Sequence, residues 1–445
     1  MSKSFFHHAL QVNEDVCTGC MHCLKVCPTA AIRMRGGKAK ISANCCIDCG
    51  ECFDACPCGA IIIEDDDLND IFNYDYRIAL VPAVLINQFK DDIPTPLIYQ
   101  VIKELGFTHI FEIEQMADFL IEEIRKYAIE HAHIKPLISS FCPAIVRLIQ
   151  VKFPSLTENL MLLKPPVDLS AMYWKQTLKK QGVPENKIGL FYITPCAAKI
   201  AALKAPVGEE HSQVTGVINM DFIYNRVLRK IKEEHRVDAE NVEHSKISAR
   251  ASLWSTTEGE KKNMLGRALA IDGIHNISEF LEKVENEELP DVDYLELRAC
   301  DESCAGGILL TGNRFLTVER MKKRAEDIQK NETPENHFVI DNDIVDYIRN
   351  NMKGEKILPR SMMILDENRG IAMKKMALIR DLMNHLPGVD CGVCGAPSCQ
   401  ALAEDIAKVE ATLTNCIFLQ TTMESRGSMT TKERIQTFRK IWGEK

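Results

Sequence analysis

The chain has 445 residues, 18 of them cysteines, and a formal net charge of −9 at pH 7. Its length predicts roughly two to four domains, and its mildly acidic charge argues against nucleic acid or an anionic membrane as a partner. Its apolar runs fall short of the ~18 residues that a membrane span requires, and Met1 to Glu14 lacks the pattern of a signal peptide. We therefore expect a cytoplasmic protein whose cysteines bind metal rather than form disulfides.

Two cysteine runs of the same form lie in the first predicted domain, residues 1–75. Each has the spacing C-x2-C-x2-C-x3-C-P of bacterial ferredoxins, in which the fourth cysteine of each run ligates the other 4Fe-4S cluster. The predicted ligands are Cys17, Cys20, Cys23 and Cys56 for one cluster, and Cys27, Cys46, Cys49 and Cys52 for the other. Zinc is the alternative metal, but zinc sites rarely use two interleaved four-cysteine runs. Cys45 and Cys58 are expected to be packed thiols.

The second predicted domain, residues 76–367, alternates apolar strands with helices. Strands are expected at residues 78–86, 108–112, 136–140, 189–194 and 294–297. One helix should be capped by Thr95, carry Pro96 at its first position and end at Gly106, and another should cover residues 116–132. This alternation predicts a parallel, doubly wound α/β arrangement. The acidic stretch 64–67 is interpreted as a solvated linker, and residues 317–359 as helical segments without visible chemistry.

Four further cysteines follow three of these predicted strands, namely Cys142, Cys196, Cys300 and Cys304. Ligands of open α/β sheets gather outside the carboxyl ends of the strands, and four thiolates suit a 4Fe-4S cluster. Gly306 and Gly307 would let the backbone approach a bulky cofactor. The alternative is that these are four unrelated core cysteines.

These segments resemble the three signature segments of iron-iron (FeFe) hydrogenases, Thr-Ser-Cys-Cys-Pro, Met-Pro-Cys-x-x-Lys and Glu-x-Met-x-Cys-x-x-x-Cys-x-x-Gly-Gly. The four cysteines match, in order, the ligands of that family's H-cluster, and Pro82 lies in a segment that resembles a strand end lining the same pocket. The resemblance covers roughly residues 76–330 and implies two α/β lobes with the H-cluster between them. It also implies that Cys304 bridges the cubane to a diiron unit carrying CO, cyanide and an azadithiolate.

Lys199 follows Cys196 by one helical turn, so its ammonium group can point toward the same cofactor. The resemblance implies that it hydrogen-bonds a cyanide ligand of the diiron unit. The alternative is an ordinary exposed lysine.

The chain departs from the family pattern at several positions. Phe141 stands where the family has its proton-relaying cysteine, and Thr194 and Arg298 stand where it has pocket methionines. The last segment is also one residue shorter before its paired glycines. Because a phenylalanine ring has no exchangeable proton, the resemblance implies slow turnover, which suits H2 sensing better than bulk catalysis.

The third predicted domain, residues 368–445, holds a different cysteine pattern, C-x2-C-x4-C-x16-C. The ligands are predicted to be Cys391, Cys394, Cys399 and Cys416, with a helix over residues 400–411. The pattern resembles a small 4Fe-4S domain of corrinoid and Rnf-type redox proteins and the domain that follows the H-domain in sensory FeFe hydrogenases, here without a PAS domain. A last helix, with a capping box at Thr430 and Glu433, is expected to dock on its own protein, and binding to a partner stays open as the alternative.

The sequence thus predicts a multidomain α/β protein: a ferredoxin-like domain, a two-lobed doubly wound H-cluster domain and a small, mostly α, 4Fe-4S domain. The resemblance implies four 4Fe-4S clusters, a diiron subcluster and reversible interconversion of protons and electrons with H2. The implied partners are a redox or signalling protein and maturation proteins. Two alternatives stay open, a sensor without turnover and a cluster-assembly protein that lacks the diiron unit.

Overall fold

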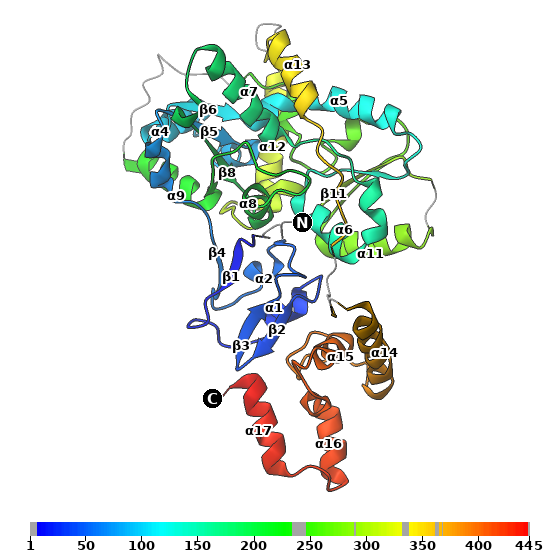
Figure 1. Cartoon of the computed structure of the whole chain (residues 1–445). Helices are drawn as coiled ribbons and strands as arrows, with labels where there is room; N and C mark the ends of the chain where they lie inside the picture. The colour runs from blue at the N-terminus through cyan, green and yellow to red at the C-terminus, as the bar shows by residue number, and fades with distance from the viewer. Residues whose placement is uncertain are drawn as a thin grey trace. The chain divides into compact units, whose positions relative to one another are not determined.

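The computed structural model describes residues 7–233, 246–288, 291–331, 338–360, 365–366 and 368–443. The chain divides into two units that can be followed in Figure 1. The larger unit is formed by Met1–Ala9 with Asp65–Pro359, and the smaller unit by Leu10–Glu64 with Arg360–Lys445. The smaller unit therefore contains the first and the last groups of cysteines together.

Two parallel sheets form the framework of the larger unit. The first has the strand order β6 (His109–Glu112), β5 (Tyr76–Val81), β8 (Ile188–Thr194) and β9 (Gly216–Asn219). The second has the order β10 (Ala268–Asp272), β11 (Tyr294–Arg298) and β7 (Leu137–Ile138). Every strand pair in both sheets is parallel. All residues of β8 and β11 are buried, as central strands of parallel sheets require, and the predicted α/β class is confirmed.

Helices connect these strands along the chain. They are α3 (Ala83–Ile86), α4 (Thr95–Glu104), α5 (Ala117–Glu130), α6 (Pro143–Lys152), α7 (Pro166–Lys180), α8 (Ala197–Lys204), α9 (Met220–Glu233), α10 (Ala249–Ser252), α11 (Ile274–Glu285), α12 (Arg314–Lys330) and α13 (Asn342–Asn351). Short 3-10 helices are η1 (Leu68–Asn73), η2 (Ile113–Met116), η3 (Pro154–Asn159), η4 (Glu185–Lys187), η6 (Lys261–Asn263) and η7 (Ser303–Gly306). Among the described residues, no helix is both long and apolar enough to cross a membrane.

Two predicted boundaries in this unit are wrong, both because of proline. The strand expected over residues 78–86 ends at Val81, since Pro82 has no amide hydrogen for the ladder, and the remaining apolar residues form α3. Pro94, not Thr95, is the residue that precedes α4, and no side chain caps that helix. Thr95 is instead its first helical residue.

The acidic stretch at residues 64–67 does more than link two segments, so its interpretation as a solvated linker needs correction. The Asp65 carboxylate accepts a hydrogen bond of 2.9 Å from the Asn219 amide, and Asp66 accepts one of 2.7 Å from the Val217 amide. Both amides belong to the edge strand β9, whose outer donors would otherwise need water. The two aspartates therefore cover a sheet edge.

The smaller unit is built from short elements. Strands β1 (Leu10–Val12) and β4 (Ile61–Ile63) pair antiparallel, as do β2 (Ile32–Arg35) and β3 (Lys38–Ile41). Its helices are α1 (His22–Val26), α2 (Glu51–Asp54), α14 (Arg369–His385), α15 (Cys399–Ala407), α16 (Ile417–Ser425) and α17 (Thr431–Trp442), with the 3-10 turn η9 (Leu413–Asn415). The capping box predicted at Thr430 and Glu433 is present at the start of α17.

Candidate metal and redox centres

Three strand ends bring the second-domain cysteines together. Cys142 and Cys196 are the residues that precede helices α6 and α8, and Pro143 begins the first of these helices. Cys300 and Cys304 follow β11 and flank a turn in which Glu302 and Ser303 have φ of 61° and 53°. The amino ends of two helices therefore lie beside the thiols, where their dipoles favour negative charge.

The electrostatic interactions of these thiols show that the four sulfurs are near neighbours. Burial raises the pKa of Cys196 to about 11, Lys199 lowers it, and Cys142 and Cys304 raise it. Burial also raises the pKa of Cys300 well above its usual value, and the other three cysteines add to the effect. The raised pKa values keep the Cys196 and Cys300 thiols protonated unless a cation replaces their protons, and a soft iron–sulfur cluster fits a donor set of four thiols.

Lys199 lies against this group of thiols. Its Nζ is 3.4 Å from the Sγ of Cys304. Burial acts to lower the pKa of Lys199, but the charges of Cys304, Tyr192 and Cys196 raise it well above its usual value. The lysine is therefore charged and partly buried, and it is not the exposed lysine of the alternative interpretation.

A cavity of about 420 Å³ opens on Cys304. Its lining includes Pro82, Phe141 and Lys199, so the structure brings these predicted site residues to one place. The hydroxyl of Tyr192 also lines it, is buried, and has no hydrogen-bond partner among the described residues. A buried orphan donor beside an ammonium group fits a polar, anionic group in this cavity, as cyanide ligands on iron would be.

Arg298, at a position where the family has a methionine, adds a second cation to the same cavity. It is 4% exposed and forms a close ion pair with Glu260. Glu260 also accepts a 2.6 Å hydrogen bond from the hydroxyl of Tyr294. Thr194, at the other replaced methionine, turns its hydroxyl to the backbone of Cys196. Glu260 was missed by sequence reasoning because it lies in a segment without periodic pattern.

Glu114 is a second acidic residue that sequence reasoning missed. It lines the 420 Å³ cavity and accepts hydrogen bonds from the Ala83 amide (2.9 Å) and the Ser255 hydroxyl (3.1 Å). Burial, followed by the charge of Glu112, raises the pKa of Glu114 to about 7. Its position two residues beyond the strand predicted at 108–112 was the available signal, because functional groups gather at such strand ends.

The ferredoxin-type cysteines fall into two interleaved groups. Burial, followed by Cys20, Cys17 and Cys56, raises the pKa of Cys23 to about 11. Burial likewise raises the pKa of Cys49, and the thiols that add to it are Cys27, Cys46 and Cys52. These last four cysteines line a cavity of about 310 Å³. The grouping fits two clusters that exchange their fourth ligands.

The two leftover thiols contact ligand loops. Cys58 Sγ lies 3.7 Å from Cys56 Sγ, and Cys45 Sγ lies 3.7 Å from the Ser42 hydroxyl that donates to it.

The third cysteine group lies at the start of α15 and beside α16. Cys394, Cys399 and Cys416 are buried. Burial raises the pKa of Cys394 to about 11, a backbone hydrogen bond at Ala396 lowers it, and Cys391, Cys416 and Cys399 raise it. Gly392 and Gly395 have φ of 76° and 80°, which lets the loop fold tightly around its cysteines. The four predicted ligands therefore lie near one another.

Fold and sites define an iron–sulfur redox protein, and comparisons with known proteins narrow the class. The family model for the iron only hydrogenase large subunit, C-terminal domain, matches residues 78–221, which include Cys142 and Cys196. A 4Fe-4S dicluster domain matches residues 9–57, and an Fe-S cluster domain matches residues 386–418. These matches make the chain similar to FeFe hydrogenases over residues 78–221, with a ferredoxin-type region before that part and a further iron–sulfur region after it.

The similar proteins are distant. The NADP-reducing hydrogenase subunit HndD of Solidesulfovibrio fructosivorans is 22% identical over 243 residues, 52% of this chain and 37% of the relative. Iron hydrogenase 1 of Clostridium pasteurianum is 25% identical over 260 residues, 54% of this chain and 42% of the relative. The chain thus spans about two fifths of the length of these curated relatives. A solved structure of a HydA1 [FeFe]-hydrogenase variant from Chlamydomonas reinhardtii aligns with a TM-score of 0.44 and 14% identity, over 66% of this chain and 97% of that one.

Proposed function

We propose that this chain is a slow FeFe-hydrogenase-type oxidoreductase that interconverts H2 with two protons and two electrons and serves in H2 sensing. One observation carries the proposal: four thiols from three strand ends converge beside a cavity that is lined by two cations, Lys199 and Arg298. An iron–sulfur cubane alone needs the thiols but not the charged cavity beside Cys304. The cavity is what favours a hydrogenase over a cluster-assembly protein.

Cys142, Cys196, Cys300 and Cys304 would hold the cubane, and Cys304 would join it to the diiron unit. When bound, that unit supplies the binding and cleavage of H2, and the protein supplies ligation, orientation and a dry pocket. Lys199 Nζ, held 3.4 Å from Cys304 Sγ, would orient an anionic ligand of the unit. Arg298 contributes a second positive charge on the β11 side, fixed by its pair with Glu260.

Glu114 is the residue suited to hold a proton in this cavity. Its pKa of about 7 lets its carboxyl both accept and release a proton near neutral pH. Its oxygens are fixed by the Ser255 hydroxyl and the Ala83 amide. Phe141, 3% exposed, packs on the Trp254 ring with centroids 5.4 Å apart and offers no proton. The family's relay cysteine is therefore missing, although the pocket beside it is retained. This combination supports slow turnover.

The remaining three cysteine groups would hold 4Fe-4S clusters that pass electrons between the H-cluster and a redox partner. A second candidate function, a sensor that signals to a partner without turnover, is favoured by the same replacement at Phe141. Both candidates need the diiron unit and therefore maturation proteins.

H2 oxidation with an artificial electron acceptor and H2 evolution with a reduced viologen should be measured on anaerobically matured protein. The proposal predicts activity in both directions at rates far below those of fast hydrogenases measured alongside. Rates equal to theirs would contradict slow turnover, and complete inactivity of protein that holds the full cofactor would leave the sensor without turnover as the function.

A further inference from the structure

The cysteine loop of the C-terminal site touches a cysteine loop of the ferredoxin-type sites. Gly392 lies between Cys391 and Val393, and a Cβ atom placed on it would be 2.8 Å from Met21 Cε and 3.4 Å from Leu24 Cδ2. Met21 directly follows Cys20 along the chain, and Leu24 directly follows Cys23. Two ligand loops separated by more than 360 positions in the sequence are thus in van der Waals contact.

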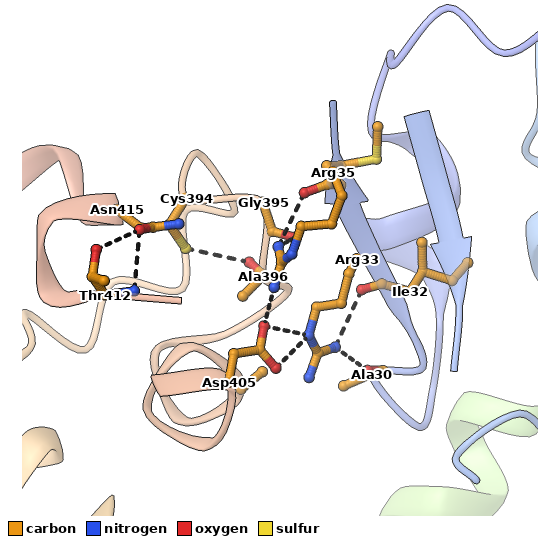
Figure 2. A network of polar contacts seen from close by, with 12 residues as sticks. Ala30, Ile32, Arg33, Arg35, Cys394, Gly395, Ala396, Asp405, Thr412 and Asn415 are labelled. Carbon is orange, nitrogen blue, oxygen red and sulfur yellow. Dashed lines mark hydrogen bonds and ion pairs between the residues drawn. The ribbon is translucent and has the colours of Figure 1, made fainter. Parts of the chain in front are cut away.

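A backbone hydrogen bond fixes this contact. The Met34 amide on β2 donates to the Gly395 carbonyl over 2.7 Å, directly after Cys394. Figure 2 shows the guanidinium group of Arg35 beside the same carbonyl, at 3.4 Å. Gly395 has φ of +80°, and a Cβ there would lie 2.5 Å from the Met34 carbonyl oxygen. The close approach therefore requires glycine.

An ion-pair cluster fixes the position of strand β2 relative to helix α15. Arg33 and Arg35 are two positions apart on β2 and so share one face of the strand. The Asp405 carboxylate of α15 accepts hydrogen bonds from Arg33 Nε (2.9 and 3.0 Å) and from Arg35 Nη2 (2.5 Å), as Figure 2 shows. Asp405 is 2% exposed. A buried carboxylate shared by two guanidinium groups fixes geometry because removing either side leaves an unpaired charge.

Helix α17 makes a third connection between the same parts. The amides of Gly36 and Gly37, in the turn of the β2–β3 hairpin, donate to the carbonyls of Lys440 (3.1 Å) and Ile441 (2.8 Å). The indole Nε1 of Trp442 donates to the Val393 carbonyl, inside the C-terminal cysteine loop, over 3.0 Å. The hairpin and the loop are thus bound to one helix.

We propose that the C-terminal cluster of Cys391, Cys394, Cys399 and Cys416 exchanges electrons directly with the ferredoxin cluster of Cys17, Cys20, Cys23 and Cys56. The inference rests on the proposed function only in that both cysteine groups hold 4Fe-4S clusters. Electron tunnelling falls steeply with distance, and contacting ligand loops give the short path it needs. One electron leaves the reduced C-terminal cluster, which becomes oxidised, and reduces the ferredoxin cluster, and an external one-electron donor then restores the first. The Asp405 cluster of charges is the positioning device.

The test is low-temperature electron paramagnetic resonance of the full chain, reduced with dithionite, together with its iron content. Reduced 4Fe-4S clusters are paramagnetic, and close neighbours split and broaden each other's signals. The wild-type spectrum is expected to differ from the sum of the Cys416→Ala spectrum and one isolated cluster signal. A spectrum equal to that sum, in protein with full iron content, would overturn the direct exchange.

Asp405→Arg should abolish this extra coupling and keep the iron, because it places three cations together and separates the loops. Glu404→Arg makes the same charge change at the neighbouring position of α15, where the side chain accepts a hydrogen bond from Gln400 of its own helix, and should keep the coupling. Coupling that persists in Asp405→Arg would overturn the positioning role. If Asp405→Arg loses iron, the comparison of the wild-type spectrum with the Cys416→Ala spectrum alone decides whether the two clusters exchange electrons directly. Equal iron in wild type and Cys416→Ala is a separate result that refutes the C-terminal cluster itself.

Discussion

At the scale of single residues, position 141 determines whether a thiol stands in the cavity beside Cys304 as a proton donor in addition to Glu114. The structure places Phe141 in the lining of this cavity, in contact with Trp254. We predict that Phe141→Cys raises the rate of H2 turnover, by up to about a hundredfold to ten-thousandfold if the thiol relays protons. Steady-state turnover on fully matured protein measures this.

Phe141→Leu is the matched control, because it also shortens the buried side chain but adds no exchangeable proton. It should leave turnover at the wild-type rate. An equal gain in the leucine variant would show that added space, and not proton transfer, limits the reaction.

Glu114 should make stability depend on pH. Its pKa is raised from 4.5 to about 7 in the folded chain, so the fold binds its proton more tightly than the unfolded chain does. The favourable contribution of this carboxyl to the free energy of unfolding is therefore fully present below about pH 4.5 and is lost as the pH rises through 7. Glu114→Gln does not titrate. We predict that, from pH 5 to pH 8, the wild type loses on the order of 3 kcal/mol of unfolding free energy relative to the variant.

Denaturant titrations at several pH values, followed by circular dichroism under anaerobic conditions, measure that difference. Parallel pH profiles for the two proteins would show that the Glu114 carboxyl is not perturbed. The same variant should also lower H2 turnover while its cofactor content stays constant, since a glutamine amide holds no transferable proton.

The spacing of residues in the sequence predicted some of these site residues but not others. Lys199 could be found because one helical turn from Cys196 fixes its direction. Glu260 and Arg298 form a buried pair only after β11 and the segment before η6 pack together, so no local pattern predicts their contact. Glu114 was predictable only in part, because the sequence predicted the strand end near it but not its contact with Ser255.

At the scale of elements, the turn of the β2–β3 hairpin holds the end of α17. Gly36 and Gly37 have φ of +58° and +76°, so alanine is strained at both positions. A Cβ on Gly37 would lie 2.4 Å from the Trp442 carbonyl oxygen, whereas a Cβ on Gly36 meets no atom within 4 Å. We predict that Gly37→Ala displaces α17 and that Gly36→Ala costs only its backbone strain of about 1 kcal/mol.

Hydrogen exchange of the α17 amides distinguishes the two variants. Protection should fall throughout α17 in Gly37→Ala and stay near the wild-type level in Gly36→Ala. Equal protection in both would mean that the hairpin does not hold the helix.

Helix and strand types were predictable here, but their ends depended on particular residues. The capping box of Thr430 and Glu433 is a local pattern, and its helix began where predicted. Its docking on its own protein was also predicted, and the hydrogen bonds to Gly36 and Gly37 confirm it. The prediction was wrong at two boundaries, the end of the strand at Pro82 and the start of α4. At both places it underestimated the effect of proline.

At the scale of the whole molecule, cysteine spacing predicted the three metal-binding regions but not their grouping. Residues 10–64 and 360–445 form one unit, because β2 packs against α15 and α17. The residues responsible include Asp405 and Arg33. Their contact cannot be predicted from the sequence, because it forms only when the two segments pack together. The ligand sets themselves stay predictions that metal analysis must test.

Iron content tests the number of clusters. Cubanes at all four cysteine groups need about sixteen irons per chain, besides the diiron unit. Deletion from Asn368 onward is predicted to remove about four of them. Cys416→Ala is the gentler control, since it leaves α17 on the hairpin, and it should lose the same amount. Unchanged iron after either change would refute the C-terminal site.

The central claim is that the four strand-end cysteines hold a cubane joined to a diiron unit, and infrared spectroscopy tests it most directly. Anaerobically matured wild-type protein should show sharp metal-CO and metal-cyanide bands. Cys300→Ala and Cys304→Ala should each lack these bands and retain the ferredoxin-type clusters. Absence of the bands from matured wild-type protein, or their persistence in both variants, would contradict the account.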